Sequence, residues 1–252
     1  MTDLRLVVPC SLIVTGSSQS GKTTLVERMI TTPGCFTEDP VEIKWLYSKL
    51  AFNQQLFDRL KANAIAPITF EEGFPEDRIQ KGTLFTAPKT ACKFLILDDI
   101  YTELSKPSQT LSDLFNIVAH HERCVIILTV QNLAAVSQRA RGSLGTVLRS
   151  TNYLCIFVNR RMHPIARYIA NNFFPGECWR ILRPFDYIIK SEERHQYILC
   201  DFTTEREKLM IRQNGILPSE TCYGFSFENE SDSDQEKEQR CDAKSPTRDE
   251  HT

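Results

Sequence analysis

The stretch SLIVTGSSQSGKTTLVERM, residues 11–29, joins an apolar run to a helix-like segment through a loop of glycine and small polar residues. Within it, residues 16–23 match the pattern G-x-x-x-x-G-K-[ST] at every fixed position. A preceding strand and a following helix are the context in which this pattern forms a phosphate-binding loop, or P-loop. Successive backbone N–H groups then point into one concavity at a helix N-terminus, which favours polyphosphate. The sequence therefore predicts a nucleotide-binding loop.

The side chains of the loop have distinct expected roles. Lys22 is expected to reach the β- and γ-phosphates, and the Thr23 hydroxyl is expected to ligate Mg²⁺. The glycines let the backbone approach the ligand closely. The predicted nucleotide-binding residues are Gly16, Ser17, Ser18, Gln19, Ser20, Gly21, Lys22, Thr23 and Thr24.

Short apolar runs alternate with helical patterns along the rest of the chain, and this alternation predicts the fold. Phe52, Leu56 and Leu60 repeat every fourth residue, as do Ile165, Ile169 and Phe173, and each set is typical of a helix. Residues 186–201 are interpreted as a terminal pair of strands. The alternation predicts an α/β fold with a doubly wound, mainly parallel sheet. The candidate strands are residues 10–15, 42–47, 67–70, 93–97, 124–130 and 153–158.

Polar side chains follow two of these runs. Asp98 and Asp99 come directly after the run at 93–97, and Gln131 follows the run at 124–130. Because parallel strands present their carboxyl ends to the ligand, these side chains are expected beside the P-loop. Asp98 would hold Mg²⁺, Asp99 would orient and deprotonate the attacking water, and Gln131 would bridge that water and the γ-phosphate.

A long segment without acidic residues begins at Arg123. From Arg123 to Gly176 there is no Asp, Glu or Lys, although average composition would place several acids there. Arginine suits bidentate contact with phosphate. The expected roles are an arginine finger delivered across a subunit interface, contacts to a nucleic-acid backbone, or pairing with acids from elsewhere in the fold. The arginines are 123, 139, 141, 149, 160, 161 and 167.

Composition and charge indicate the domain organisation and the cellular compartment of the protein. The 252 residues carry a net charge of -2, and residues 226–252 hold nine Asp/Glu against four Lys/Arg with almost no apolar residues. We therefore expect a P-loop ATPase domain at 1–225 and a disordered acidic tail at 226–252. Nine cysteines without a C-x-x-C pair indicate buried free thiols in a reducing compartment. No apolar run is long enough to predict a membrane span, and the first residues do not have the pattern of a signal peptide, so we expect an intracellular, non-secreted protein.

With these pieces in order, the chain resembles the FtsK/HerA-type DNA-packaging ATPases of double-stranded DNA viruses, specifically the short form of Polinton/Maverick elements and adintoviruses and, more distantly, of poxviruses. The resemblance covers roughly residues 10–220. The matching stretches are GSSQSGKTTL (16–25), LYSK followed by a glutamine-containing helix (46–57), FEEGFP (70–75), FLILDDI (94–100), AHHERCVIILTVQNL (119–133), LRSTNYLCIFVNRR (148–161), FFPGE (173–177) and REKLMIRQNGILPSE (206–220).

The resemblance implies a P-loop fold of the additional-strand (RecA/FtsK-like) type and a ring-forming motor that hydrolyses ATP to drive double-stranded DNA into a preformed capsid. Its implied partners are DNA of any sequence, further copies of the chain and capsid vertex proteins, in the host cytoplasm or nucleus or with the virion. Arg149 matches the arginine finger best, with Arg141 as the alternative. Many related motors have Glu where Asp99 stands, so either the attacking water lies closer to the backbone here or turnover is slow.

Two other functions share the P-loop. A small-molecule or nucleoside kinase would transfer phosphate to an acceptor and would need an arginine-rich lid. A non-catalytic assembly subunit would bind ATP structurally, but intact Lys22, Thr23, Asp98 and Asp99 count against it.

Overall fold

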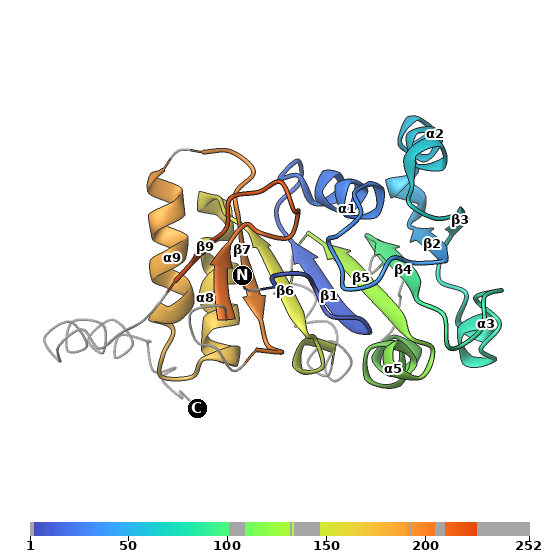
Figure 1. Ribbon diagram of the computed structural model, residues 1–252. Helices are drawn as coiled ribbons and strands as arrows, with labels where there is room; N and C mark the ends of the chain where they lie inside the picture. Colours follow the sequence, from blue (N-terminus) through green and yellow to red (C-terminus); the bar gives the residue numbers. More distant parts are fainter. Residues whose placement is uncertain are drawn as a thin grey trace, which may run out of the picture.

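The computed structural model describes residues 3–100, 109–131, 133, 147–191, 193–204 and 210–225. Across these residues the centre of the molecule is a nine-stranded sheet with the order β3-β2-β4-β5-β1-β6-β7-β8-β9 (Figure 1). Neighbouring strands are parallel from β3 to β6 and antiparallel from β6 to β9. The predicted α/β fold with a doubly wound, mainly parallel sheet is confirmed.

The strands follow the apolar runs of the sequence. Strands β1, β4, β5 and β6 are buried at every position, as expected for parallel strands covered on both faces. The bounds are β1 Cys10–Thr15, β2 Glu42–Tyr47, β3 Ile68–Glu72, β4 Lys93–Asp98, β5 Cys124–Val130, β6 Tyr153–Phe157, β7 Tyr197–Asp201, β8 Ile211–Gln213 and β9 Tyr223–Gly224.

Helices cover both faces of the sheet and give a three-layer arrangement. Helices α1 and α2 lie on one face, and α3 and α5 lie on the other (Figure 1). The bounds are α1 Lys22–Thr31, α2 Gln54–Asn63, α3 Glu76–Gln80, α4 Gln109–Asp113, α5 Ala119–His121, α8 His163–Phe173 and α9 Trp179–Lys190. Shorter turns are η1 Lys49–Ala51, the π-helical η3 Leu114–Val118 and η4 Arg160–Met162.

The interpretation of residues 186–201 as two strands is wrong. Residues up to Lys190 belong to helix α9, and the strand that follows is β7, which pairs with β8 from further along the chain. Ile181, Phe185 and Ile188 are buried at helical spacing, and this stripe decides the segment. Pro184 lies inside α9. Because proline normally disfavours a helix interior, the sequence pattern around it did not indicate a helix.

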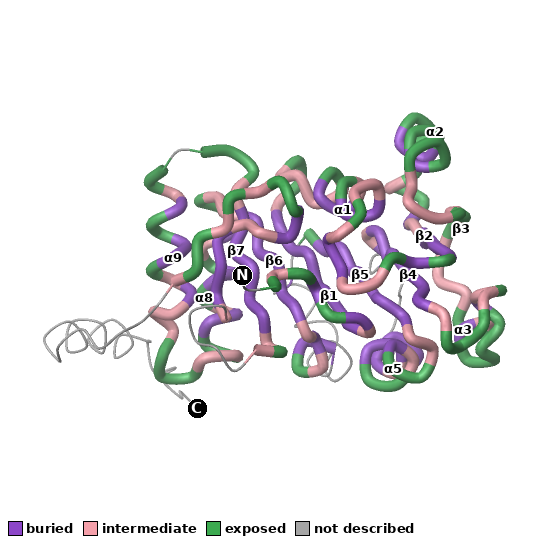
Figure 2. Tube along the Cα trace, in the orientation of Figure 1, coloured by how far each residue is buried: buried purple, intermediate pink, exposed green. Residues whose placement is uncertain are grey.

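Two apolar cores lie on the two faces of the sheet, and the buried strands run between them (Figure 2). One core joins Val26 and Met29 of α1 to Leu56 of α2 and to Leu217. The other joins the α4–α5 region to α8 and α9, through residues such as Ile181. The cysteines fit this picture: the eight described ones form no disulfide, and all but Cys178 and Cys222 are buried.

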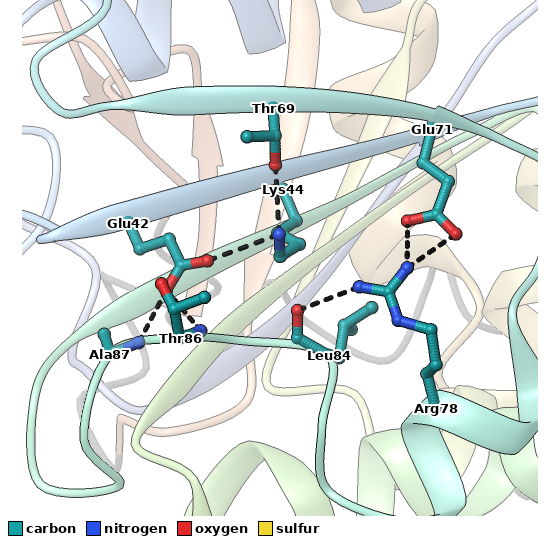
Figure 3. A network of polar contacts seen from close by, with 8 residues as sticks. All are labelled: Glu42, Lys44, Thr69, Glu71, Arg78, Leu84, Thr86 and Ala87. Atoms are coloured by element: carbon teal, nitrogen blue, oxygen red, sulfur yellow. Dashed lines mark hydrogen bonds and ion pairs between the residues drawn. The ribbon is translucent and has the colours of Figure 1, made fainter.

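A buried polar network fixes the edge of the sheet that carries β2 and β3 (Figure 3). The Glu42 carboxylate accepts hydrogen bonds from the backbone N–H groups of Thr86, at 2.9 Å, and Ala87, at 2.8 Å. Lys44 Nζ lies 3.3 Å from Glu42 and donates to Thr69 Oγ1 at 3.1 Å. Charged groups of this kind are tolerated in an interior because each one is paired. The network ties the loop before β4 to β2.

The segment that follows β8 is held against the α1 face by one carboxylate. Glu220 accepts hydrogen bonds from the Tyr197 hydroxyl and from the backbone N–H groups of Gly215 and Leu217.

The described part of the chain contains no helix that meets the length and apolarity of a membrane span. Residues 226–252 lie outside the described residues, so the boundary at 225 stays a prediction.

Candidate active site

The predicted P-loop connects the end of β1 to the first residue of α1. Its last glycine, Gly21, has a φ of 108°, a left-handed conformation that favours glycine. A Cβ added there would lie 3.2 Å from Nδ1 of His195 and 3.3 Å from Cε1 of Phe157. Both the backbone conformation and the close packing therefore require glycine directly before Lys22.

The Lys22 ammonium is folded back onto its own loop. Nζ donates to the carbonyl oxygens of Gly16, at 2.7 Å, and Ser17, at 3.0 Å. Burial lowers the pKa of Lys22, while the charges of Asp99 and Asp98 act in the opposite direction. The lysine thus lies within the field of the predicted metal ligand Asp98 and the predicted catalytic Asp99, and its partners are neutral carbonyls that a phosphate would outcompete.

Asp98 is the last residue of β4 and is 6% exposed. The Thr129 hydroxyl donates a 2.7 Å hydrogen bond to its Oδ1. Burial raises the pKa of Asp98, against the opposing effects of the Thr129 hydrogen bond and the Lys22 charge. A cation at the second oxygen would favour the ionised form, so the donor set fits Mg²⁺. Asp98 and the Thr23 hydroxyl, with phosphate oxygens and water, would hold the ion.

Asp99 has an unusual backbone conformation for a residue other than glycine, with a φ of 53°. Its N–H donates to the Thr129 hydroxyl at 3.1 Å, so one threonine holds both aspartates. Gln131 Nε2 donates to Asp99 Oδ2 at 3.2 Å. Burial raises the pKa of Asp99, while the charge of Lys22 and the hydrogen bond from Gln131 act to lower it. A carboxylate with a raised pKa beside a carboxamide is suited to orient and deprotonate a water.

Sheet order explains why these residues meet. Strand β5 lies between β1, which leads into the P-loop, and β4, which ends in Asp98. The register pairs Thr15 with Val130 and Asp98 with Thr129, so all three strands end at the same edge. This is the additional-strand arrangement that the resemblance implied. The predicted P-loop, both aspartates and Gln131 are therefore brought together.

Arg149 lies at the edge of the sheet opposite the P-loop. It precedes β6, where Asn152 donates to the carbonyl of Ser11 near the start of β1, and the P-loop begins at the opposite end of that six-residue strand. At about 3.3 Å per residue, the strand separates the two edges by about 20 Å. The structure does not bring Arg149 to the P-loop of its own chain. The alternative, Arg141, lies outside the described residues.

The other described arginines of the acid-free stretch lie in three places: Arg123 directly before β5, Arg160 and Arg161 after β6, and Arg167 in α8. Arg123 pairs with Glu38, which bears out the pairing expected for some of them. Arg160 and Arg161 follow β6 at the P-loop edge and are exposed. Arg139 lies outside the described residues.

Three residues that contact the site were not predicted from the sequence. Thr129 is a buried hydroxyl within the apolar run CVIILTV, and that break in polarity was an available signal. Asn159 Nδ2 donates to Ser17 Oγ at 3.1 Å, and His195 Nδ1 lies 2.9 Å from the carbonyl oxygen of Ser20. Asn159 lies in the family-like stretch 148–161 but was given no role there, and His195 lies outside every matching stretch, so tertiary structure was needed to find these contacts.

Strand order, P-loop and paired aspartates define a P-loop NTPase fold of the additional-strand type. No protein-family model matches the chain, and no curated protein sequence matches it. Solved structures do. The chain is similar to the genome packaging NTPase B204 from Sulfolobus turreted icosahedral virus 2 in complex with ATPγS, at 14% identity and a TM-score of 0.51, over 82% of this chain and 98% of that one.

Two more structures of the same kind agree. The complex of that NTPase with AMP gives 13% identity and a TM-score of 0.53, over 83% of this chain and 99% of the other. B204, the DNA-packaging ATPase from Sulfolobus turreted icosahedral virus, gives 12% identity and a TM-score of 0.54, over 82% and 97%. At these identities the likeness shows a shared fold, and it spans nearly the whole length of the solved proteins.

Proposed function

We propose that this chain hydrolyses ATP and uses the energy to move double-stranded DNA into a viral capsid, as a motor of the FtsK/HerA type. The observation that carries the ATPase proposal is the convergence of Lys22, Asp98 and Asp99 at one sheet edge, with Gln131 hydrogen-bonded to Asp99. Each of these groups acts on a triphosphate or on the water that attacks it.

In this proposal the side chains act in sequence. Lys22 leaves the carbonyls of its own loop and binds the β- and γ-phosphates. Asp98 and Thr23 would hold Mg²⁺, and the ion would neutralise part of the phosphate charge. Gln131 orients a water against the carboxylate of Asp99, which accepts the proton as that water attacks the γ-phosphate. The bond between the γ-phosphorus and the β–γ bridging oxygen breaks, and ADP leaves with that oxygen.

Two observations support DNA as the partner. The solved proteins that share the fold over nearly their whole length are named as genome-packaging enzymes. The stretch from Arg123 to Gly176 also supplies arginine without lysine or acid, and guanidinium groups suit a phosphate backbone. The proposal extends to capsid vertex proteins as partners and to an intracellular or virion-associated location.

The position of Arg149 supports a ring. It lies at the sheet edge away from its own P-loop, so a role at a γ-phosphate requires the active site of a neighbouring copy. An arginine supplied in this way stabilises the transition state rather than the bound substrate. We therefore expect Arg149→Ala to bind ATP with near-normal affinity and to lose most turnover.

Mixing two inactive chains tests this arrangement. An Asp99→Asn chain keeps Arg149, and an Arg149→Ala chain keeps Asp99, so one complete site forms where the first lends its arginine to the second. Phosphate release by the mixture should exceed that of either variant and should rise with protein concentration. If native mass spectrometry shows mixed oligomers but the mixture stays inactive, Arg149 is not the finger and Arg141 is tested next.

Product analysis tests the reaction class. With γ-labelled ATP, a motor releases labelled inorganic phosphate, and duplex DNA accelerates the release. A kinase instead transfers the label to a small acceptor. A non-catalytic assembly subunit binds ATP and releases no label with or without DNA.

A further inference from the structure

The loop between β2 and α2 carries the most exposed large apolar side chain of the described residues. Leu50 is 87% exposed, and Phe52 is 54% exposed. Both belong to the β2–α2 loop, residues 48–53, which joins the two elements toward the β3 end of the sheet (Figure 1). Water around apolar side chains is unfavourable, so neighbouring exposed apolar side chains indicate a contact surface.

Hydrogen bonds at both ends of the β2–α2 loop fix its shape. In η1, the N–H of Ala51 donates to the carbonyl oxygen of Ser48 at 2.8 Å. At the other end, the Asn53 side chain accepts from the N–H of Leu56 at 3.0 Å and caps α2. The loop therefore presents Leu50 to solvent in a defined position.

The β2–α2 loop lies beside the catalytic aspartate. The N–H of Ser48 donates to the carbonyl oxygen of Asp98 at 3.2 Å, and the register pairs Tyr47 with Asp98. Asp99 is the next residue of that strand's chain, and Gln131, which bonds to it, is exposed. Because neighbouring strands are about 4.8 Å apart, a molecule that covers Asp99 has only one strand spacing to cross before it reaches β2.

The proposed reaction needs such a molecule. The described residues that follow β4 and β5 include no arginine, and Arg160 and Arg161 follow β6 on the other side of β1. Arg149 lies at the opposite edge of the sheet, so the proposed function takes its guanidinium from a neighbouring copy. A copy that delivers an arginine beside Asp99 must pack on this edge, where the β2–α2 loop offers apolar surface.

The charges around the β2–α2 loop favour a protein partner over DNA. Glu72, the last residue of β3, is exposed and lies in register with Tyr47 at the start of the loop. Asp58 is exposed on α2, where Gln54 Nε2 donates to it at 2.7 Å. Carboxylates at this position repel a phosphate backbone, whereas leucine and phenylalanine gain from burial against protein.

We propose that the β2–α2 loop is a contact surface for a second copy of this chain, and that Leu50 and Phe52 become buried when that copy covers the active-site edge. The inference rests on the proposed function, in which a neighbouring copy completes the site. It deepens that function by assigning the surface on which the neighbour packs.

Sedimentation velocity measures the protein concentration at which half of the chains have assembled, with Mg²⁺ and a non-hydrolysable ATP analogue present. The test variant is Leu50→Asp, because Phe52 also packs against Tyr47 and Phe57 within the chain. Leu50→Met keeps the apolar surface and is the conservative variant. Ile117→Asp is the matched control, since Ile117 is 50% exposed and lies in η3, which leads through α5 to the start of β5.

Burial of one leucine side chain on association changes the association constant by about tenfold or more. We expect Leu50→Asp to raise the half-assembly concentration at least about tenfold, and Leu50→Met and Ile117→Asp to stay within about twofold of the wild type. The affinity of dilute, unassembled chains for the analogue and the unfolding midpoint of Leu50→Asp should not change. Its phosphate release from Mg·ATP should fall at low protein concentration and recover as the concentration rises.

Assembly of Leu50→Asp at the wild-type concentration would overturn the inference. If that variant also lost the acceleration by duplex DNA, the β2–α2 loop would be a DNA contact instead. A wild type that assembles through Leu50 but releases no phosphate would refute the proposed motor and would still support the contact between copies. A wild type that stays monomeric at every concentration would overturn the inference together with the ring.

Discussion

Replacing Thr129 with valine tests how the two aspartates are held. The side chain is 1% exposed, and valine keeps its shape while removing the hydroxyl that donates to Asp98 and accepts from the N–H of Asp99. A hydrogen bond to a charged group contributes about 1.5–3 kcal/mol and a neutral one about 0.5–1.5 kcal/mol. We therefore expect Thr129→Val to lower the free energy of unfolding by about 2–4 kcal/mol.

Metal binding should weaken in the same variant. Without the hydroxyl, the Asp98 carboxylate loses a hydrogen bond that opposes the rise of its pKa, and its orientation is no longer fixed. We expect about a tenfold loss of Mg²⁺ affinity in the presence of ATP, which corresponds to about 1.4 kcal/mol.

Thr129→Ser is the control because it keeps the hydroxyl and loses one methyl group, at a cost of about 1 kcal/mol. Urea unfolding without metal gives the stability of each variant, and calorimetric titration gives the Mg²⁺ affinity. The reasoning is refuted if the valine and serine variants are equally stable and bind Mg²⁺ equally well.

Three further substitutions separate binding, catalysis and stability. Lys22→Ala should abolish detectable ATP binding in calorimetry, because it removes the cation that reaches the β- and γ-phosphates; retained affinity would contradict the loop assignment. Asp99→Asn should bind ATP but release phosphate at least about 100-fold more slowly, as is typical when a general base is lost; equal turnover would exclude Asp99 as the base. Asp98→Asn should raise the thermal midpoint in metal-free buffer at neutral pH. Burial raises the folded-state pKa of Asp98, so its ionised form costs folding free energy, and wild-type stability should increase as pH falls through that pKa toward the ordinary carboxyl range. A lower midpoint for Asp98→Asn would show that its charge is compensated in the folded protein.

Local pattern was sufficient for the centre of the fold. The runs at 10–15, 42–47 and 124–130 became strands with those bounds, because continuous apolarity and flanking polar residues are properties of the segment itself. Asp98, Asp99 and Gln131 were found for a related reason. The ends of parallel strands are shared by topology, so the sequence order of strands already places them at one edge.

The remainder depended on contacts between distant segments. Helix α9 was missed because Pro184 argues against a helix locally, whereas burial of Ile181 and Phe185 against α8 and the sheet favours one. His195 is 175 residues from Ser20 in the chain, and no spacing rule connects them. Such contacts are a property of the folded chain rather than of any segment.

The rate of phosphate release from Mg·ATP, measured with and without blunt duplex DNA of unrelated sequences, tests the central claim most directly. The account predicts magnesium-dependent release that duplex DNA accelerates whatever its sequence. The acceleration should fall as salt rises, because arginine–phosphate contacts release counterions. Asp99→Asn should lower both the basal and the stimulated rate at least about 100-fold. A rate that duplex DNA leaves unchanged at low salt, in a protein that binds ATP and assembles into oligomers, would contradict the DNA motor.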